Sequence, residues 1–223
     1  MRRLKSKQIL NYFFLLFLFG SITNLNFQNN QFLNLKEIIV SGLDEKENED
    51  FKKKIYNLKL NNIFFINENQ IKNVFETNSL IESYKISKIY PSTLDIKINK
   101  TNLLAKINKN GKILFVGSNG KLSEIFSHDK KLPFIFGKPK IQEFLDFKKV
   151  LDESKFSYDE VKNFYFFPSK RWDIELKNKI ILKLPNEDIK NTLDYLFEFL
   201  DNKNLYNSRI IDARINNQII LND

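Results

Sequence analysis

The alternation of apolar and polar residues is clearest in residues 80–100, LIESYKISKIYPSTLDIKINK. It continues on both sides of a central Tyr-Pro-Ser step, which is typical of two half-buried strands joined by a turn. Upstream, residues 35–43 (LKEIIVSGL) predict another strand that stops at a glycine. Apolar residues at helical spacing predict two short helices at 44–57 and 68–77, the second with Asn67 as its N-cap. The order β-α-α-β-β predicts a small α+β domain with its helices on one face of a short sheet.

The remaining part of the chain, residues 101–223, carries mostly strand signals. Two apolar runs flank the dipeptide Asn110-Gly111, which favours a hairpin with a type I′ turn. Pro133, Gly137 and Pro139 predict a loop. Further strands are predicted at 171–177, 179–184, 209–215 and 219–221, and helices at 141–154 and 187–201. We therefore expect a mainly antiparallel β domain with flanking helices, in which Trp172 shares the core-facing side of its strand with Ile174 and Leu176.

An apolar run at the amino end extends from Ile9 to Phe27, with a dense centre at 9–22. A spanning helix needs about 20 residues, and the whole run has about 19, whereas its centre is nearer the length of a signal-peptide core. The run ends in GSITNLNF, without the small residues of a cleavage site, so a retained anchor is favoured over a cleaved signal peptide. Four basic residues ahead of the run predict a cytoplasmic amino end, namely Arg2, Arg3, Lys5 and Lys7.

These observations predict the organisation of the whole chain. The expected order is a cytoplasmic segment at 1–8, a transmembrane helix at 9–27, a spacer at 28–34, and domains at 35–100 and 101–223. With a cytoplasmic amino end, the bulk of the chain would lie in the bacterial periplasm.

Composition argues against most kinds of enzyme. The 223 residues include no Cys, six Gly and a single His, His128. A thiolate nucleophile and a His-pair metal site are therefore excluded, and phosphate-cradling glycine loops are disfavoured. Carboxylate pairs such as Asp44 with Glu45 fall at predicted helix starts, where they complement the helix dipole. We expect a protein without catalytic activity, cofactor or metal.

The net charge of +9 first suggests a nucleic-acid partner. Four of the positive charges precede the apolar run, however, and the other Lys residues are spread along the chain. A solvated basic surface is the favoured interpretation, with no nucleic acid and no small-molecule substrate.

The order of these segments resembles the bacterial cell-division family FtsQ/DivIB over nearly the whole chain. Members of this family have a short cytoplasmic end, one membrane helix, a polypeptide-transport-associated (POTRA) domain and a β-rich domain. The resemblance is carried by IIVSGL (38–43), NNIFFINENQIKNVFE (61–76), the stretch 80–100, LPFIFGK (132–138), RWDIELKNKIILKLP (171–185) and IIDARI (210–215).

The resemblance implies a scaffold of the division machinery at the septum, held in the inner membrane. Its implied partners are the coiled-coil division proteins FtsB and FtsL, with indirect links to the peptidoglycan synthase pair FtsW and FtsI. In the family, partners bind the last strand of the β domain, where an open edge accepts an added strand. In this sequence that strand corresponds to Arg214, Ile215, Asn216, Asn217, Gln218, Ile219, Ile220 and Leu221.

Two other functions compete with this interpretation. One is an envelope-assembly or secretion factor, which would use its POTRA domain to hold extended polypeptides. The other is an envelope enzyme with a removed signal, which would need a polar catalytic cluster within 101–223, and the sequence offers none.

Overall fold

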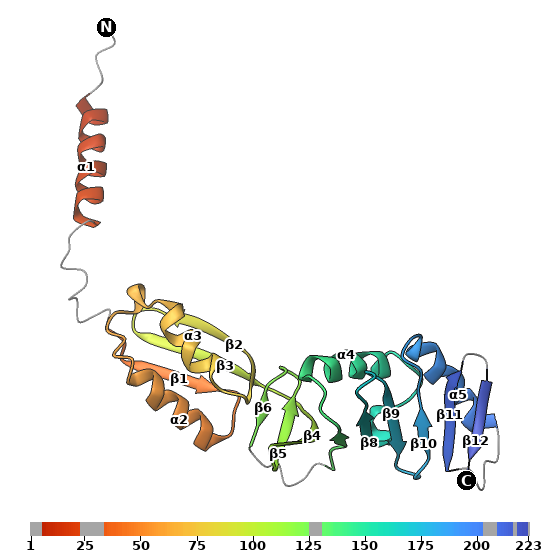
Figure 1. Ribbon diagram of the computed structural model, residues 1–223. Coiled ribbons are helices and arrows are strands. Elements are labelled where there is room, and N and C mark those ends of the chain that lie inside the picture. The colour runs from red at the N-terminus through yellow and green to blue at the C-terminus, as the bar shows by residue number, and fades with distance from the viewer. Residues whose placement is uncertain (1–5, 23–33, 125–130, 203–208, 216–217, 223) are drawn as a thin grey trace. The chain divides into compact units, whose positions relative to one another are not determined.

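The computed structural model describes residues 6–22, 34–124, 131–202, 209–215 and 218–222 (Figure 1). The chain divides into two compact units. The first comprises Met1–Phe75 with Tyr84–Ile98, and the second Glu76–Ser83 with Asn99–Asp223.

The amino-terminal apolar run forms a helix, α1 (Ser6–Ile22). Its large apolar side chains from Ile9 to Phe19 are exposed. Among the described residues, no helix combines the length and the apolarity needed to cross a membrane. The predicted span continues through residues 23–27, which lie outside the described residues, as do Arg2, Arg3 and Lys5, whereas Lys7 lies in α1.

Beyond α1, the first unit has the expected β-α-α-β-β order. A three-stranded sheet runs β1-β3-β2, with β1 parallel to β3. Asn67 accepts a hydrogen bond from the N–H of Asn69 at 3.0 Å, so the predicted N-cap of the second helix is confirmed. The elements are β1 (Glu37–Ser41), α2 (Glu45–Tyr56), the 3₁₀ helix η3 (Ile63–Phe65), α3 (Glu68–Glu76), β2 (Ile81–Ile89) and β3 (Thr93–Lys100).

The helices of the first unit bury the apolar stripe that their spacing predicted. Phe51 of α2 stacks on Phe75 of α3 with ring centroids 5.6 Å apart. Gly42 directly follows β1 with φ of 109°, and an added Cβ would lie 1.8 Å from the carbonyl oxygen of Ile98. Only glycine fits this approach of two backbones, which explains why the first strand stops there.

The second unit contains a sheet of nine described strands in the order β12-β11-β10-β9-β8-β7-β4-β5-β6. Five of its pairings are antiparallel and three are parallel. The strands are β4 (Leu103–Lys109), β5 (Lys112–Gly117), β6 (Leu122–Ser123), β7 (Phe134–Phe136), β8 (Val161–Phe166), β9 (Trp172–Leu176), β10 (Ile181–Lys183), β11 (Ile210–Ile215) and β12 (Gln218–Asn222). Two helices, α4 (Ile141–Asp152) and α5 (Ile189–Asn202), and the 3₁₀ helix η4 (Tyr158–Glu160) complete the unit.

The hairpin turn is confirmed, because Asn110 and Gly111 have φ of 54° and 82°. Two strands were missed. β8 was not predicted, and β7 lies where Pro133 and Gly137 predicted a loop. β7 pairs in parallel with both β4 and β8, and α4 connects β7 to β8 in the chain. The domain is therefore mainly antiparallel with a parallel centre, which sequence patterning did not reveal.

A row of apolar residues crosses the sheet strand by strand and forms the core beneath α4 and α5. Trp172 stacks on Phe147 of α4 at 4.9 Å and meets the edge of Phe164 of β8 at 6.4 Å. The predicted core position of Trp172 is thus confirmed. The row is Ile107, Ile135, Phe164, Ile174, Leu182, Ile211 and Leu221, each the register partner of the next. Its first six residues are buried, whereas Leu221 in the last strand is 41% exposed.

Replacing Phe164 by Ala should lower the free energy of unfolding of the second unit by about 3–5 kcal/mol, because Phe164 is fully buried at the centre of this core. Urea unfolding followed by fluorescence would measure the loss, since Trp172 is the single Trp of the chain and lies in this unit. The matched control is Ile113→Ala in β5, a side chain that is 50% exposed. We expect its effect to stay within about 0.5 kcal/mol, and equal losses in the two variants would contradict the assignment of the core.

Candidate partner-binding edge

Among the described strands, β12 lies at one end of the nine-stranded sheet and pairs with β11 alone (Figure 1). Its register partners run from Ile210↔Asn222 to Ile215↔Gln218, with a shift between Asp212 and Ile215. In an antiparallel strand, alternate residues direct both N–H and C=O to the same side. Among the described strands none covers the outer side of β12, so alternate residues present hydrogen-bonding groups at a free edge.

The structure places the predicted partner-binding residues on this hairpin. Arg214 and Ile215 end β11, and Gln218–Leu221 lie in β12, whereas 216–217 are outside the described residues. Ile215, Ile220 and Leu221 are 56%, 38% and 41% exposed. Ile219 is half-buried and packs against the core of the second unit. The hairpin is therefore attached to the core through Ile219, while its other aliphatic side chains are exposed.

A groove of about 420 Å³ runs between α5 and the β11–β12 hairpin. Tyr195 of α5 is 55% exposed and lines it opposite Ile215. The other lining residues are Asp188, Asn191, Thr192, Ala213, Gln218 and Ile219. The groove lies on the helix-covered side of the sheet, next to the strand with the free edge, so a strand added to β12 would find apolar and polar contacts beside it.

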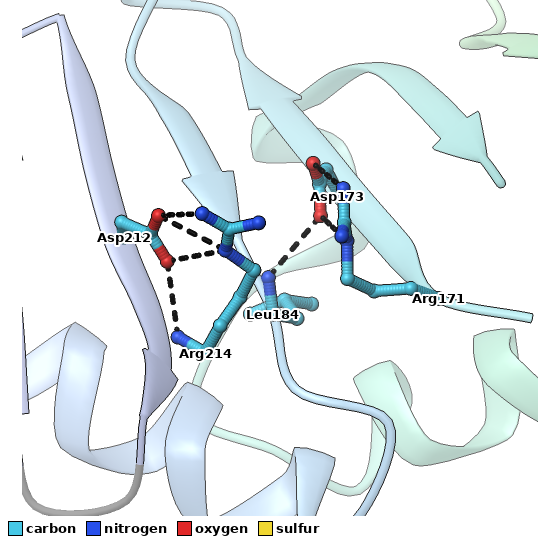
Figure 2. A network of polar contacts seen from close by, with 5 residues as sticks. All are labelled: Arg171, Asp173, Leu184, Asp212 and Arg214. Atoms are coloured by element: carbon cyan, nitrogen blue, oxygen red, sulfur yellow. Dashed lines mark hydrogen bonds and ion pairs between the residues drawn. The ribbon is translucent and has the colours of Figure 1, made fainter. Parts of the chain in front are cut away.

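Figure 2 shows the ion pair that holds the end of β11. Asp212 is only 7% exposed, and the Nε of Arg214 donates to both of its carboxylate oxygens at 2.8 and 3.0 Å. The backbone N–H of Arg214 donates to the same carboxylate at 3.1 Å. Chiefly through the side-chain hydrogen bonds of Arg214, the pKa of Asp212 is lowered. This pair fixes the backbone at the point where the β11–β12 register shifts.

A second buried carboxylate, Asp173 of β9, behaves differently (Figure 2). Asp173 is 3% exposed, accepts from the Nε of Arg171 at 3.1 Å, and accepts from the backbone N–H of Leu184 at 3.3 Å. Its pKa is raised, because burial penalises the charged form more than Arg171 stabilises it. The pKa values of the two Asp residues are thus shifted in opposite directions, although each carboxylate is buried and paired with an Arg.

Lys183 of β10 lies between the two Asp residues in the register of the sheet. It is the register partner of Asp173 on one side and of Asp212 on the other. The same row continues to Ile220 of β12. Because neighbours across a sheet share a face, the face opposite α4 and α5 carries a line of alternating charge that ends at the free edge.

The sequence predicted the hairpin residues but missed Arg171, Asp173 and Lys183. The alternation of strands 171–177 and 179–184 already placed Asp173 and Lys183 opposite the core-facing residues. Whether Asp173 and Lys183 lie side by side with Asp212 depends on the register of the three strands, which local sequence patterns do not determine. Within the described ranges, no group of three or more His, Cys, Asp or Glu is placed to hold a metal ion. The chemistry that this edge offers is main-chain hydrogen bonding flanked by aliphatic contacts.

Comparisons with known proteins agree with this architecture. A family model described as "POTRA domain, FtsQ-type" matches residues 33–100. A second, "Cell division protein FtsQ/DivIB, C-terminal", matches residues 98–214. No curated protein matches the chain. Among solved structures, the chain is similar to the major extracytoplasmic domain of the trans isomer of the bacterial cell-division protein DivIB from Geobacillus stearothermophilus, with 11% identity and a TM-score of 0.31 over 43% of this chain and 87% of that one.

The two carboxylates are predicted to affect the pH dependence of the free energy of unfolding in opposite directions. The lowered pKa of Asp212 contributes stability that is present above the unfolded-state pKa of about 4 and is lost as the pH falls through the folded-state pKa. Asp212→Asn should therefore cost about 1–3 kcal/mol at pH 7, and the difference from the native chain should vanish in acid. Urea unfolding followed by Trp172 fluorescence across a pH series measures both effects.

The matched control is Asp173→Asn, which keeps a side-chain acceptor for the N–H of Leu184. The raised pKa of Asp173 means that its contribution is fully present below the unfolded-state pKa and is lost as the pH rises through the folded-state pKa. Asp173→Asn should consequently leave stability at pH 7 unchanged or increased. An equal loss in the two variants at pH 7 would refute the difference between the sites.

Proposed function

The chain belongs to the FtsQ/DivIB family of cell-division proteins, and we propose that it is a non-enzymatic scaffold that binds its partners by strand addition to β12. The single observation that carries this proposal is the free edge of β12, which ends the sheet of the unit containing the FtsQ/DivIB C-terminal match. A partner strand gains main-chain hydrogen bonds there, while neighbouring side chains select which strand fits.

The proposed partners are the division proteins FtsB and FtsL. Through them the scaffold would hold the septal peptidoglycan synthase pair, FtsW and FtsI, at midcell. Support comes from the family membership and from the chemistry of the edge, where exposed aliphatic residues flank a row of backbone groups. A short apolar strand following a coiled coil would match both features.

We also propose the arrangement in the envelope. Residues 9–27 would anchor the chain in the inner membrane, with 1–8 in the cytoplasm and the domains at 35–100 and 101–223 in the periplasm at the septum. The exposed large apolar side chains of α1 support an anchor. The basic residues Arg2, Arg3, Lys5 and Lys7 support the orientation.

A second candidate function is an envelope-assembly factor that holds extended polypeptides. The sheet of the first unit ends in β1 and β2, so among the described strands it also has two free edges. In this alternative the client would pair with β2, and binding would be broad rather than directed at one coiled-coil partner.

Adjacent proline substitutions in β12 test the first proposal. Of any two neighbouring residues, one directs its N–H toward β11 and the other toward the free edge. We therefore expect that one of Ile220→Pro and Leu221→Pro keeps the unit folded and abolishes capture of FtsB and FtsL, while the other disrupts the β11–β12 pairing. Co-purification with FtsB and FtsL measures capture, midcell fluorescence of an amino-terminally labelled chain measures recruitment, and thermal unfolding separates the two variants.

The control is the same pair of substitutions in β2, Lys85→Pro and Ile86→Pro. These should leave capture of FtsB and FtsL unchanged if β12 is the binding edge. Capture that survives in a folded β12 variant would contradict strand addition at β12. Binding of unrelated extended polypeptides that is lost in the β2 variants would favour the assembly-factor alternative.

The groove beside β12 predicts side-chain selectivity. Ile215→Asp and Tyr195→Ser should each weaken partner binding by about 1–3 kcal/mol, because they remove exposed apolar surface that lines the groove. Both side chains are more than half exposed, so the free energy of unfolding should change by no more than about 0.5 kcal/mol. Calorimetry with a peptide of the partner strand checks the first effect and urea unfolding the second. Unchanged affinity in both variants would exclude the groove from the interface.

A further inference from the structure

The first unit carries an exposed cluster formed by Phe64, Phe65, Ile89 and Tyr90, here called the aromatic cluster because three of its four residues are aromatic. These side chains are 53%, 60%, 49% and 55% exposed. The rings of Phe64 and Tyr90 stack with centroids 4.7 Å apart, which joins η3 to the turn between β2 and β3. Large apolar residues gathered on a surface in this way mark a binding site for a protein or a membrane.

The local structure holds the cluster outward. Ile63 and Ile66 on either side of the two Phe residues are 0% and 6% exposed, so they fix η3 to the core. Asn62 caps this 3₁₀ turn, because its side chain accepts from the N–H of Phe64 at 3.0 Å. With the flanking residues buried and the turn capped, Phe64 and Phe65 cannot turn inward without breaking these contacts.

The cluster lies where the chain from α1 enters this unit. The N–H of Leu35 donates to the carbonyl of Asn61 at 2.9 Å, and the N–H of Lys36 donates to the carbonyl of Ser92 at 2.9 Å. Asn61 and Ser92 lie only a few residues from Phe64 and Tyr90 in the chain. Leu35 and Lys36, just before β1, are therefore tied to both segments that carry the cluster.

The length of the intervening chain sets an upper limit on the distance between the end of α1 and the cluster. α1 ends at Ile22, and Asn34 forms a bridge with Asn62. The chain between Ile22 and Asn34 spans at most roughly 40 Å when fully extended. Any surface into which α1 inserts is therefore within reach of Phe64 and Phe65.

We propose that the aromatic cluster seats the first unit on the outer surface of the phospholipid bilayer that holds α1. This inference rests on the proposed membrane anchoring of residues 9–27. Tyr90 has an apolar ring with a polar hydroxyl, which favours the boundary between headgroups and acyl chains. Phe64 and Phe65 supply apolar surface for the acyl side of that boundary. Lys36, whose backbone N–H bonds to Ser92 two residues beyond Tyr90, and Lys59, which precedes Phe64 by a few residues, are both exposed and carry the charge that attracts anionic headgroups. Because the unit is tethered, a weak intrinsic affinity suffices for it to stay seated.

A single fluorescent label tests this in the full chain. The sequence has no Cys, so Phe65→Cys and the control Lys46→Cys each create one labelling site. Lys46 is exposed in the first turn of α2, which follows the far end of β1. The labelled chain is reconstituted in vesicles of phosphatidylcholine and phosphatidylglycerol, with and without lipids brominated in the acyl chain. We expect blue-shifted emission that the bromolipids quench at position 65, and neither effect at position 46.

A second variant links the signal to the cluster. Phe64→Ser and Tyr90→Ser are added to the labelled chain. They should lower the ratio of membrane-bound to unbound first units by about tenfold or more, because they remove the apolar area that the two rings place in lipid. The chain should still float with the vesicles, since α1 is unchanged. Thermal unfolding confirms that the variant stays folded.

Three results would overturn the proposal, and they are distinguishable. If the chain floats with vesicles and the labels at 65 and 46 are equally wet, the lipid seat is wrong and the proposed anchor stands. If the chain does not float, the anchor and the seat both fail. If the label at 65 responds only to added FtsB and FtsL, the cluster is a protein-binding surface instead.

Discussion

In the second unit, the buried apolar row determines which face of the sheet every other strand residue occupies. Phe164, Ile174, Leu182 and Ile211 are register partners in four successive strands, and each is fully buried under the helices. A slip of one residue in any of these strands would turn its apolar set to the opposite face and leave the aromatic side chains of α4 without partners. The core therefore fixes the register of the sheet as far as β11.

The position of the charged residues on the opposite face follows from the alternation of side chains along each strand. Since Ile174, Leu182 and Ile211 face the helices, their neighbours Asp173, Lys183 and Asp212 must share the other face. A carboxylate in that position is largely removed from water, so each requires a cation close by. Arg171 and Arg214 supply it from two residues away along the same strand or the segment leading into it. The electrostatics of the edge hairpin are thus a consequence of how the core on the other side is packed.

Local patterns in the sequence were sufficient where structure depends on neighbours in the chain. The turn at Asn110-Gly111, the N-cap at Asn67 and the core-facing side of Trp172 all follow from spacing and residue type. The three-residue strand β7 could not be predicted in this way, because only its parallel neighbours β4 and β8 make it a strand. Its own flanking Pro and Gly indicate a loop.

The same distinction separates the two parts of the candidate site. The resemblance to the family predicted that partners bind the last strand, and the aliphatic pattern of that strand was visible in the sequence. The edge position of β12, in contrast, is a property of strand order, since β11 joins the sheet through parallel pairing with β10 after the crossover by α5. The pairing of Asp173 and Asp212 across Lys183 likewise exists only once the three strands are in register.

Under the proposed strand addition, main-chain hydrogen bonds at the free edge of β12 would give only weak binding, so the side chains would have the deciding role. A five-residue strand presents about two or three residues outward, hence roughly 4–6 main-chain hydrogen bonds of about 1 kcal/mol each. Association costs at least about 4 kcal/mol in lost translational and rotational freedom, so the ladder alone leaves almost no net affinity. Micromolar binding requires about 8 kcal/mol in total. Ile215 and the groove on one face, and Ile220 on the other, must supply the difference. A partner strand with apolar side chains on both faces gains binding free energy from both sets of contacts. An ordinary surface strand is apolar on one face only and gains from one set.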